Sequence, residues 1–445
     1  MKTLMIAAMH SSAGKTVTTC ALLAALKQRG KRLQAFKCGP DYIDPMFHER
    51  VIGVPSRNLD LFLQGEEGVL KTFSRAEADL ALIEGAMGYY DGLNNTTDAS
   101  AYALAQLTKT PAVLVITPGG SSLTLAAQVK GLMGFRPNSG ITALILANSP
   151  ERRFTSLAPV LERETGLPVL GYLPPMEEAR FESRHLGLLT AREIGDLSTR
   201  IGKLGEAAER CIDLDRLLTL AGTWKVTSAK PTAGLSRCRI AAARDEAFCF
   251  TYADNLDALE EAGAELVFFS PLRDMELPNA DGLYLPGGYP ELYAGALSEN
   301  RAMMDSIAAA VKAGLPTVAE CGGFLYLGQS LEDAAGRAHP MCGVLPGAGF
   351  KTGHLQRFGY QTITAPADSL LFRAGEQIPA HEFHYWDSTR NGADLTASKA
   401  DGRSWDSGYV SLHLYAAFPH LHFGGALPLS ERFVKACEQW KASMT

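Results

Sequence analysis

Continuous apolar runs alternate with segments of helical periodicity through the first half of the chain. The runs lie at residues 4–9, 33–39, 78–86, 111–118, 141–148 and 168–174. Strands that are buried on both faces of a sheet are apolar throughout, whereas strands with one face in water alternate between apolar and polar positions. The pattern therefore predicts a doubly wound parallel sheet with helices on both faces.

The same alternation restarts after a short polar stretch, TWKVTSAKPTAGLS, whose proline and glycine are typical of a linker. Further strand-like runs follow at residues 239–243, 265–270, 281–288 and 315–323. A chain of 445 residues is longer than one hydrophobic core ordinarily organises. We therefore expect two α/β domains, residues 1–222 and 237–445, joined by the linker 223–236.

Composition argues against a nucleic-acid-binding, zinc-binding or membrane protein. Hydrophobic residues make up 46% of the chain and the net charge is −6, so no surface for nucleic acid is expected. The eight cysteines form no C-x-x-C pair and no Cys/His cluster with zinc-ligand spacing, which favours buried thiols in a reduced, cytoplasmic setting. The polar stretch His10–Lys15 interrupts the N-terminal apolar run well before about 18 residues, so we expect no targeting or membrane segment.

The first strand-like run is followed by a candidate phosphate-binding loop. SSAGKT places Gly14, Lys15 and Thr16 between a strand and a helix. Small residues allow backbone N–H groups to face phosphate oxygens, the lysine supplies positive charge, and the threonine can bind Mg²⁺. Met9 occupies the position at which the usual pattern G-x-x-x-x-G-K-[ST] has its first glycine. The loop therefore predicts a nucleotide site of a variant subclass.

Charged residues follow the next two predicted strands. FKCGPDYIDP carries Lys37, Asp41 and Asp44, and LIEGAMGYYDG carries Glu84 and Asp91. Because ligands bind at the carboxyl ends of the strands in open parallel sheets, we expect these side chains to converge on the phosphates. Several carboxylates beside a triphosphate fit a site that binds metal or transfers protons. Solvated acids on surface loops are the alternative.

The second half contains a candidate nucleophile in LPTVAECGGFLYL, where an apolar strand leads into Cys321, two glycines and a helix. On such a turn a thiol is exposed at the sheet edge, and we expect the helix N-terminus to lower its pKa. A buried core cysteine would show the same local pattern. DGLYLPGGYPELY adds Gly287 and Gly288, whose N–H groups could face an oxyanion.

Together these motifs resemble a known family. SSAGKT, FKCGPDYIDP, SRNLD and IEGAMGYYDG resemble the N-terminal half of cobyrinic acid a,c-diamide synthases, whose ATP-binding P-loop domain is similar to dethiobiotin synthetase. Family members commonly have Gly-Thr where this chain has Ala8 and Met9. The motifs of the second half, with DEAFCFTYADNLDALE, SPLRD, HEFHY and FPHLHF, resemble a class I glutamine amidotransferase domain of the cobyrinate and cobyric acid synthase type. The resemblance covers nearly the whole chain.

This resemblance implies ATP-dependent amidation of the a and c carboxylates of cobyrinate, in the biosynthesis of cobalamin. Each carboxylate would be phosphorylated by ATP, and ammonia from L-glutamine, passed between the domains inside the protein, would displace the phosphate. The implied ligands are a tetrapyrrole, L-glutamine, ATP and Mg²⁺, with neither nucleic acid nor membrane as a partner. A related macrocycle, such as hydrogenobyrinic acid or a nickel sirohydrochlorin, is the alternative substrate.

The resemblance also implies roles for residues of the first half. Lys15 and Thr16 would hold the β- and γ-phosphates and Mg²⁺, beside Gly14, and Lys37 would bridge the γ-phosphate and the attacking carboxylate. Asn148, which ends a strand, could bind the adenine edge or merely form a turn. The acids Asp41, Asp44, Glu84 and Asp91 would position metal, substrate or ammonia, with Thr16, Glu84 and Asp41 as the metal ligands.

In the second half, Cys321 would form a glutamyl thioester, with the N–H groups of Gly288 and Gly322 at the oxyanion. The family signature near the C-terminus fits FPHLHF with His420 as the base. Many class I glutaminases have a glutamate two places after that histidine, where this chain has His422. The other histidines considered are His413 as the runner-up base, and His381 and His384 as structural residues or neighbours of the substrate. A partitioning or regulatory ATPase, the rival class, would need no such thiol and base.

Overall fold

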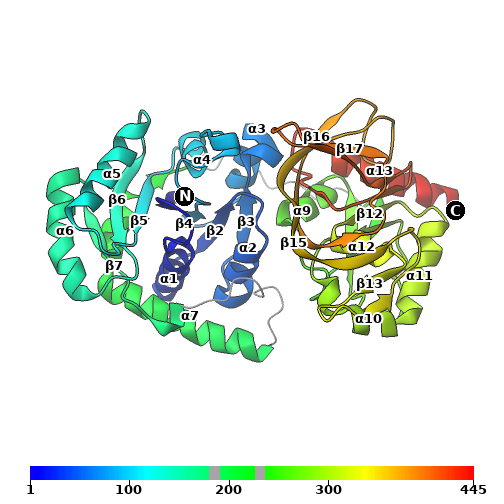
Figure 1. Ribbon diagram of the computed structural model, residues 1–445, viewed down its shortest axis with the longest axis horizontal. Coiled ribbons are helices and arrows are strands. Elements are labelled where there is room, and N and C mark those ends of the chain that lie inside the picture. Colours follow the sequence, from blue (N-terminus) through cyan, green and yellow to red (C-terminus); the bar gives the residue numbers. More distant parts are fainter. Residues whose placement is uncertain (180–190, 226–235, 445) are drawn as a thin grey trace. The chain divides into compact units, whose positions relative to one another are not determined.

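The computed structural model describes residues 1–179, 191–225 and 236–444, and the chain divides into two compact units (Figure 1). The N-terminal unit comprises Met1–Leu61 and Gly65–Ala229, and the C-terminal unit comprises Phe62–Gln64 and Lys230–Thr445. Most of the predicted linker, residues 226–235 of 223–236, lies outside the described residues.

The N-terminal unit is built on one sheet in the order β3-β2-β4-β1-β5-β6-β7, and the pairings along this path are all parallel. Its strands are β1 (Lys2–Ala8), β2 (Leu33–Cys38), β3 (Ser56–Leu59), β4 (Leu80–Glu84), β5 (Ala112–Ile116), β6 (Ile141–Leu146) and β7 (Val169–Tyr172). A short strand, β8 (Gly222–Thr223), pairs antiparallel with β1. The predicted parallel sheet is confirmed, and β3 is an additional edge strand that the apolar pattern did not predict.

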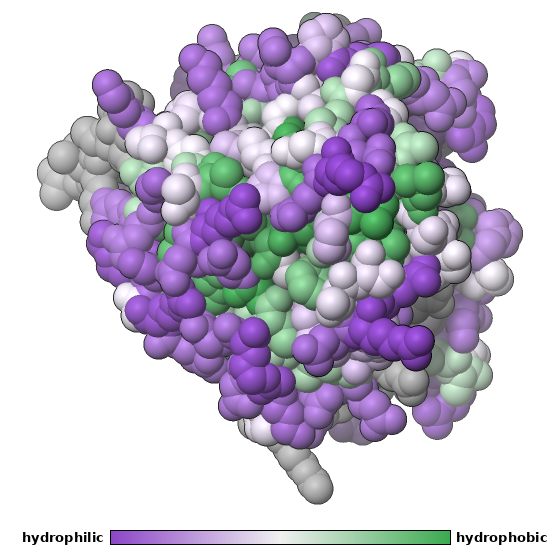
Figure 2. All heavy atoms as spheres, turned by 90° about the vertical axis from the view of Figure 1, so that its left-hand side faces the viewer, coloured by the Kyte–Doolittle hydropathy of each residue, from purple (hydrophilic) through white to green (hydrophobic). Residues whose placement is uncertain are grey.

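Helices cover both faces of this sheet (Figure 1). The α-helices are α1 (Lys15–Gln28), α2 (Ile43–Phe47), α3 (Leu61–Ser74), α4 (Ala101–Thr108), α5 (Leu123–Phe135), α6 (Glu151–Thr165), α7 (Ala191–Cys211) and α8 (Leu214–Leu220). Alternate residues of β1 enter different cores: Leu4 packs with residues of α1 and α7, whereas Met5 packs with residues of α3 to α6. This burial on two sides explains the unbroken apolar runs. On the face that includes α6, hydrophilic residues surround a hydrophobic area (Figure 2).

The C-terminal unit contains a six-stranded sheet in the order β10-β9-β11-β12-β20-β19, parallel except for the edge strand β19. Its strands are β9 (Cys238–Ala243), β10 (Ala264–Phe269), β11 (Gly282–Leu285), β12 (Thr317–Glu320), β19 (Tyr409–Val410) and β20 (Leu414–Ala417). Its helices are α9 (Ala253–Glu261), α10 (Ala294–Glu299), α11 (Arg301–Lys312), α12 (Gly322–Leu327) and α13 (Leu429–Met444). The second α/β fold is thereby confirmed.

A second sheet in this unit was not predicted. It comprises β13 (Ser330–Glu332), β14 (Ala338–Pro340), β15 (Ala348–Thr364), β16 (Gln377–Ser388), β17 (Leu395–Ser398), β18 (Ser404–Ser407) and β21 (His420–Leu421). The long strands β15 and β16 pair with two shifts of register and present many polar residues, so they lack the apolar runs of the first sheet. This sheet includes β21, which carries the predicted base His420.

Candidate active sites

The predicted phosphate loop leads from β1 into α1. Gly14 caps the helix with a φ of 92°, and a Cβ there would lie 2.9 Å from the Cβ of Ala147. A glycine is therefore required both by the backbone conformation and by the close approach of Ala147, the residue after β6. Lys15 is buried, and its ammonium group donates hydrogen bonds to the backbone carbonyls of His10, at 3.1 Å, and Met87. Its charge thus lies inside the loop.

Lys37 and Glu84 meet because they are direct neighbours in the parallel pairing of β2 with β4. The Lys37 ammonium lies 2.9 Å from Glu84 Oε1 and also binds Asp44 Oδ2. The Thr16 hydroxyl donates to the same Glu84 oxygen at 2.6 Å. The structure therefore brings together Thr16, Lys37, Asp44 and Glu84, as expected for strand ends that share one edge.

Burial and neighbouring charges act together on this cluster. Burial lowers the pKa of Lys15 to about 8, assisted by the charge of Lys37 and opposed by Glu84 and Asp91. Burial disfavours the charge on Lys37, but Asp44 and Glu84 raise its pKa well above the usual value. Burial also disfavours the Glu84 carboxylate, but Lys37 and the other partners outweigh this and lower its pKa. Burial and Glu84 raise the pKa of Asp44.

His48 belongs to this cluster and was not predicted. It is fully buried on a turn of π-helix (His48–Ile52), with Nε2 3.4 Å from Glu84 Oε2 and Nδ1 3.1 Å from the Ser56 hydroxyl. Thr16 and Lys37 bind Glu84 Oε1, and His48 lies beside the other oxygen. A lone histidine seven residues after Asp41 carries no pattern that would have revealed this contact.

The remaining predicted residues lie at the same edge of the sheet. Asp41 is half-buried, and its Oδ1 accepts the backbone N–H of Ile43 at the start of α2. Asp91 is exposed, and its carboxylate accepts the Gly88 N–H at 2.9 Å. Asn148 is exposed with a φ of 49°, directly after the residue that packs on Gly14. It could therefore serve a ligand or simply form the turn.

The chemistry of the donor set fits Mg²⁺. A hydroxyl oxygen, that of Thr16, lies against a carboxylate, that of Glu84, and oxygen ligands of this kind are those that Mg²⁺ prefers. Within the described residues no group of three or more His, Cys, Asp and Glu side chains has the arrangement of a metal cage. Few protein ligands are typical of magnesium sites that share the ion with a nucleotide.

In the C-terminal unit, Cys321 lies between β12 and α12. Its φ of 48° and ψ of −100° form a strained turn, and its N–H donates to the carbonyl of Ala417 on the adjacent strand at 2.8 Å. The side chain is only 5% exposed. The expectation of a lowered thiol pKa is wrong: burial raises it, with Glu291 and Glu382 adding to the effect, and the Gly322 N–H opposes this only in part.

Gly287 lies between Cys321 and His420. A Cβ on Gly287 would lie 2.4 Å from Cε1 of His420 and 3.4 Å from Cβ of Cys321. The thiol and the imidazole therefore approach each other across a residue that has no side chain. His420 is buried, and burial with the nearby His381 and His384 lowers its pKa to about 3. The imidazole is accordingly neutral near pH 7 and can accept a proton.

The two predicted oxyanion residues are adjacent. The position of a Cβ on Gly322 would be 3.1 Å from the backbone nitrogen of Gly288 and 2.9 Å from Cδ of Pro290. A Cβ on Gly288 would lie 2.1 Å from the carbonyl oxygen of Ala247. Both glycines are therefore needed for close backbone packing beside Cys321.

The other histidines occupy different positions. His413 is exposed and precedes β20 at the end where β12 begins, so it lies at the opposite edge of the sheet from Cys321. The His422 ring packs 4.8 Å from that of Tyr252. His384 stacks on Phe418, with centroids 3.9 Å apart, and His381 pairs with His420 across β16 and β21.

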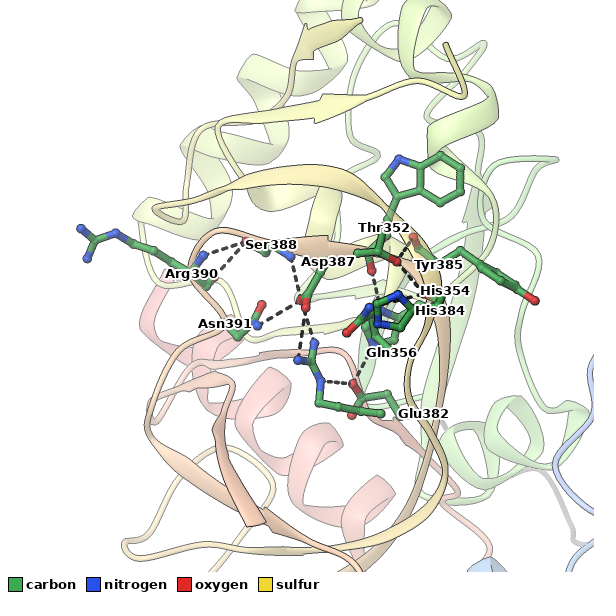
Figure 3. A network of polar contacts seen from close by, with 12 residues as sticks. Thr352, His354, Gln356, Glu382, His384, Tyr385, Asp387, Ser388, Arg390 and Asn391 are labelled. Carbon is green, nitrogen blue, oxygen red and sulfur yellow. Dashed lines mark hydrogen bonds and ion pairs between the residues drawn. The ribbon is translucent and has the colours of Figure 1, made fainter. Parts of the chain in front are cut away.

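Polar residues of β15 and β16 support this histidine cluster. Glu382 is buried, binds His384 Nε2 at 2.6 Å and accepts a hydrogen bond from Arg357 Nε at 2.7 Å. Arg357 also pairs with Asp387 at 2.7 Å. Figure 3 shows Glu382, His384 and Asp387 in one network of polar contacts. Burial disfavours the charge on Glu382, but His384 and Arg357 outweigh this and lower its pKa.

Glu320 was also missed, although it directly precedes the nucleophile. Its buried carboxylate accepts the Leu421 N–H at 2.8 Å and the Tyr284 hydroxyl at 3.0 Å. One carboxylate thereby ties β12, which leads to Cys321, to β21, which carries His420. Burial raises the pKa of Glu320 to about 7. The sequence signal was its place directly before Cys321, as the one charged residue of β12.

These two units define a class of protein: an enzyme that combines a nucleotide-binding domain with a glutamine amidotransferase domain. Residues 4–188 match the family described as CobQ/CobB/MinD/ParA nucleotide binding domain. Residues 239–427 match the family described as CobB/CobQ-like glutamine amidotransferase domain. Among the described residues, no helix is both long and apolar enough to cross a membrane.

Similar proteins extend the match to nearly the whole chain. Cobyrinate a,c-diamide synthase from Clostridium acetobutylicum is 39% identical over 98% of this chain and 100% of its own length. The protein of the same name from Listeria monocytogenes is 40% identical over 95% of this chain and 96% of its own. That from Thermoplasma volcanium is 38% identical over 97% and 96%. The chain belongs to the cobyrinate a,c-diamide synthase family of ligases.

Proposed function

We propose that the protein uses ATP and L-glutamine to amidate the a and c carboxylates of cobyrinate, through acyl phosphates. The observation that carries the proposal is the placement of Gly287 between Cys321 and His420, since this gives a thiol and a neutral base a common reaction site. Identity over nearly the full length to proteins named for this reaction supports the substrate.

In the N-terminal unit, Lys15 would exchange its carbonyl partners for the β- and γ-phosphates. Mg²⁺, held by Thr16 and Glu84 with Asp41 as a further candidate, would neutralise phosphate charge when bound. Lys37 would hold the substrate carboxylate, whose oxygen attacks the γ-phosphorus while ADP leaves. Ammonia would then displace inorganic phosphate from the acyl carbon and leave the amide.

The other predicted residues of this unit would orient the reactants. Asp44, bound to Lys37, would keep the lysine in place, and Asp91 would face the phosphate loop, because its charge acts on Lys15. Gly14 would let the loop close around phosphate, and Asn148 would bind the adenine edge. His48 would hold Glu84 in position to bind the metal.

In the C-terminal unit, the Cys321 thiol would give its proton to His420 and attack the side-chain amide carbon of glutamine. The N–H groups of Gly288 and Gly322 would stabilise the oxyanion that forms. The proton would pass to the leaving ammonia, and water would hydrolyse the glutamyl thioester to glutamate. The neutral state of both groups in the resting site fits transfer of a proton within the reaction.

The experiment incubates the protein with cobyrinate, hydrogenobyrinate or a nickel sirohydrochlorin, with MgATP and glutamine, and follows products by mass spectrometry. Two successive changes of acid to amide on cobyrinate, with glutamate and ADP released in step, are expected. If only another macrocycle is amidated, the proposed reaction is correct but cobyrinate is not the substrate. ATP hydrolysis without any amide would refute the proposal.

The proposal includes a cytoplasmic location, which the eight free cysteines support.

A further inference from the structure

Glu291 lies close to the nucleophile without a role in the chemistry described above. It belongs to a short 3-10 helix (Pro290–Leu292) that begins two residues after Gly288. That turn packs on α12, because Pro290 Cδ lies 2.9 Å from the position of a Cβ on Gly322. After burial, the nearby Glu291 charge contributes most to raising the pKa of the Cys321 thiol.

Among the described residues, the carboxylate of Glu291 differs from the other acids near the thiol in how it is paired. In the described part of the chain no cationic side chain forms an ion pair with it, and the hydrogen bond that acts on its charge comes from its own backbone N–H. The other acids near the thiol differ: Glu382 binds Arg357 and His384, and Glu320 accepts two hydrogen bonds. Burial raises the pKa of Glu291 to about 7. The residue is half-buried and so keeps part of its surface exposed.

The α-ammonium group of glutamine is a cation that could pair with Glu291. Its α-ammonium is four bonds from the amide carbon that the thiol attacks, which places it within about 5 Å of that carbon. A carboxylate in surroundings that disfavour its charge binds a cation more strongly than one in water. We propose that Glu291 is the subsite for the α-ammonium group of L-glutamine. This inference rests on the proposed glutaminase function.

The test compares two substrates in the intact protein: L-glutamine, and glutaramate, which is glutamine without the α-amino group. Ammonia release gives kcat/KM for each, in the wild type and in Glu291→Gln, which keeps the shape and removes the charge. We expect the wild type to prefer glutamine by about 10² or more and the variant to lose most of this preference. Glu291→Asp should fall between them because the shorter acid keeps the charge.

Glu299→Gln is the matched control, since Glu299 is an exposed glutamate at the end of α10. It should keep the wild-type preference. A proportional loss for both substrates in Glu291→Gln would assign Glu291 a structural role and overturn the subsite, and so would an unchanged preference. If the wild type releases no ammonia from glutamine, the proposed function itself fails, so the two failures are distinguishable.

Discussion

The reactive side chains of the two units differ in how their charges are compensated. In the N-terminal unit Lys37 is fixed between Asp44 and Glu84, so the cluster is charged but paired. In the C-terminal unit burial raises the pKa of Cys321 and lowers that of His420 to about 3, so thiol and imidazole are both neutral. The phosphate site is thus preorganised by ion pairs. If Cys321 and His420 act as proposed, their charges form only during the reaction.

His420→Ala tests the assignment of the base. Without it no group takes the thiol proton, so we expect glutamine-dependent turnover to fall by roughly 10² to 10⁴. His413→Ala should retain most activity, because His413 is exposed at the opposite edge of the sheet. Glutamate release from purified variants measures both. A larger loss in His413→Ala than in His420→Ala would reassign the base.

Glu320→Gln makes a prediction about stability and pH. The pKa of Glu320 is raised from 4.5 to about 7 in the fold, so the folded state holds a proton that the unfolded chain has lost. Below pH 4.5 Glu320 is protonated in both states, so its titration changes the free energy of unfolding little. As the pH rises, the titration lowers this free energy, and the full loss is reached above pH 7. Replacement by glutamine should raise the free energy of unfolding at pH 8 by up to roughly 3 kcal/mol relative to its effect at pH 4.

Denaturant titration of both proteins at the two pH values measures this difference. The substitution keeps an oxygen for the Leu421 N–H, so the tie between β12 and β21 survives in the variant. An equal effect at pH 4 and pH 8 would mean that Glu320 does not titrate in this range.

At the scale of elements, the sequence predicts the parallel strands well and the rest of the fold poorly. Apolar runs reveal strands such as β1 because burial on both faces leaves no polar positions. β15 and β16 were missed because their register shifts and mixed polarity break both periodicities. The motifs pointed to Lys15, at the start of the helix that follows β1 and its loop, and to Cys321, directly after β12. His48 and Glu320 were missed because their partners come from distant segments.

The loop after β11 offers a test of packing between elements. Gly287→Ala would put a methyl group 2.4 Å from a ring carbon of the buried His420, so ring or loop must move. A displacement of about 1 Å at a reacting group can cost roughly 10²-fold, and we expect a loss of that order in glutamine hydrolysis. Gly295→Ala in α10 is the control, because its nearest neighbour, His339, would be 3.6 Å away. Equal activity of the two variants would show that the approach of Gly287 to His420 is not needed.

At the scale of the whole molecule, the proposed function makes each unit a separate catalytic site, with ammonia as the intermediate that they share. Each has its own sheets and its own cores. The predicted reactive residues of each site lie within a single unit. If this division is correct, ammonia added to the solution must replace the C-terminal site but cannot replace the N-terminal one.

Cys321→Ser and Lys15→Ala test this division as a pair. Without the thiol no thioester forms, so Cys321→Ser should lose glutamine-supported amidation by roughly 10³-fold or more and keep amidation from ammonium salts above about pH 8. Lys15→Ala should lose both, since no acyl phosphate forms without the phosphate contact. A purely structural cysteine would behave differently: a buried hydroxyl costs about 1 to 3 kcal/mol and would lower both rates together. The ratio of ammonia-supported to glutamine-supported amide formation distinguishes a catalytic cysteine from a structural one. An unchanged ratio in Cys321→Ser would refute the assignment of Cys321 as the nucleophile.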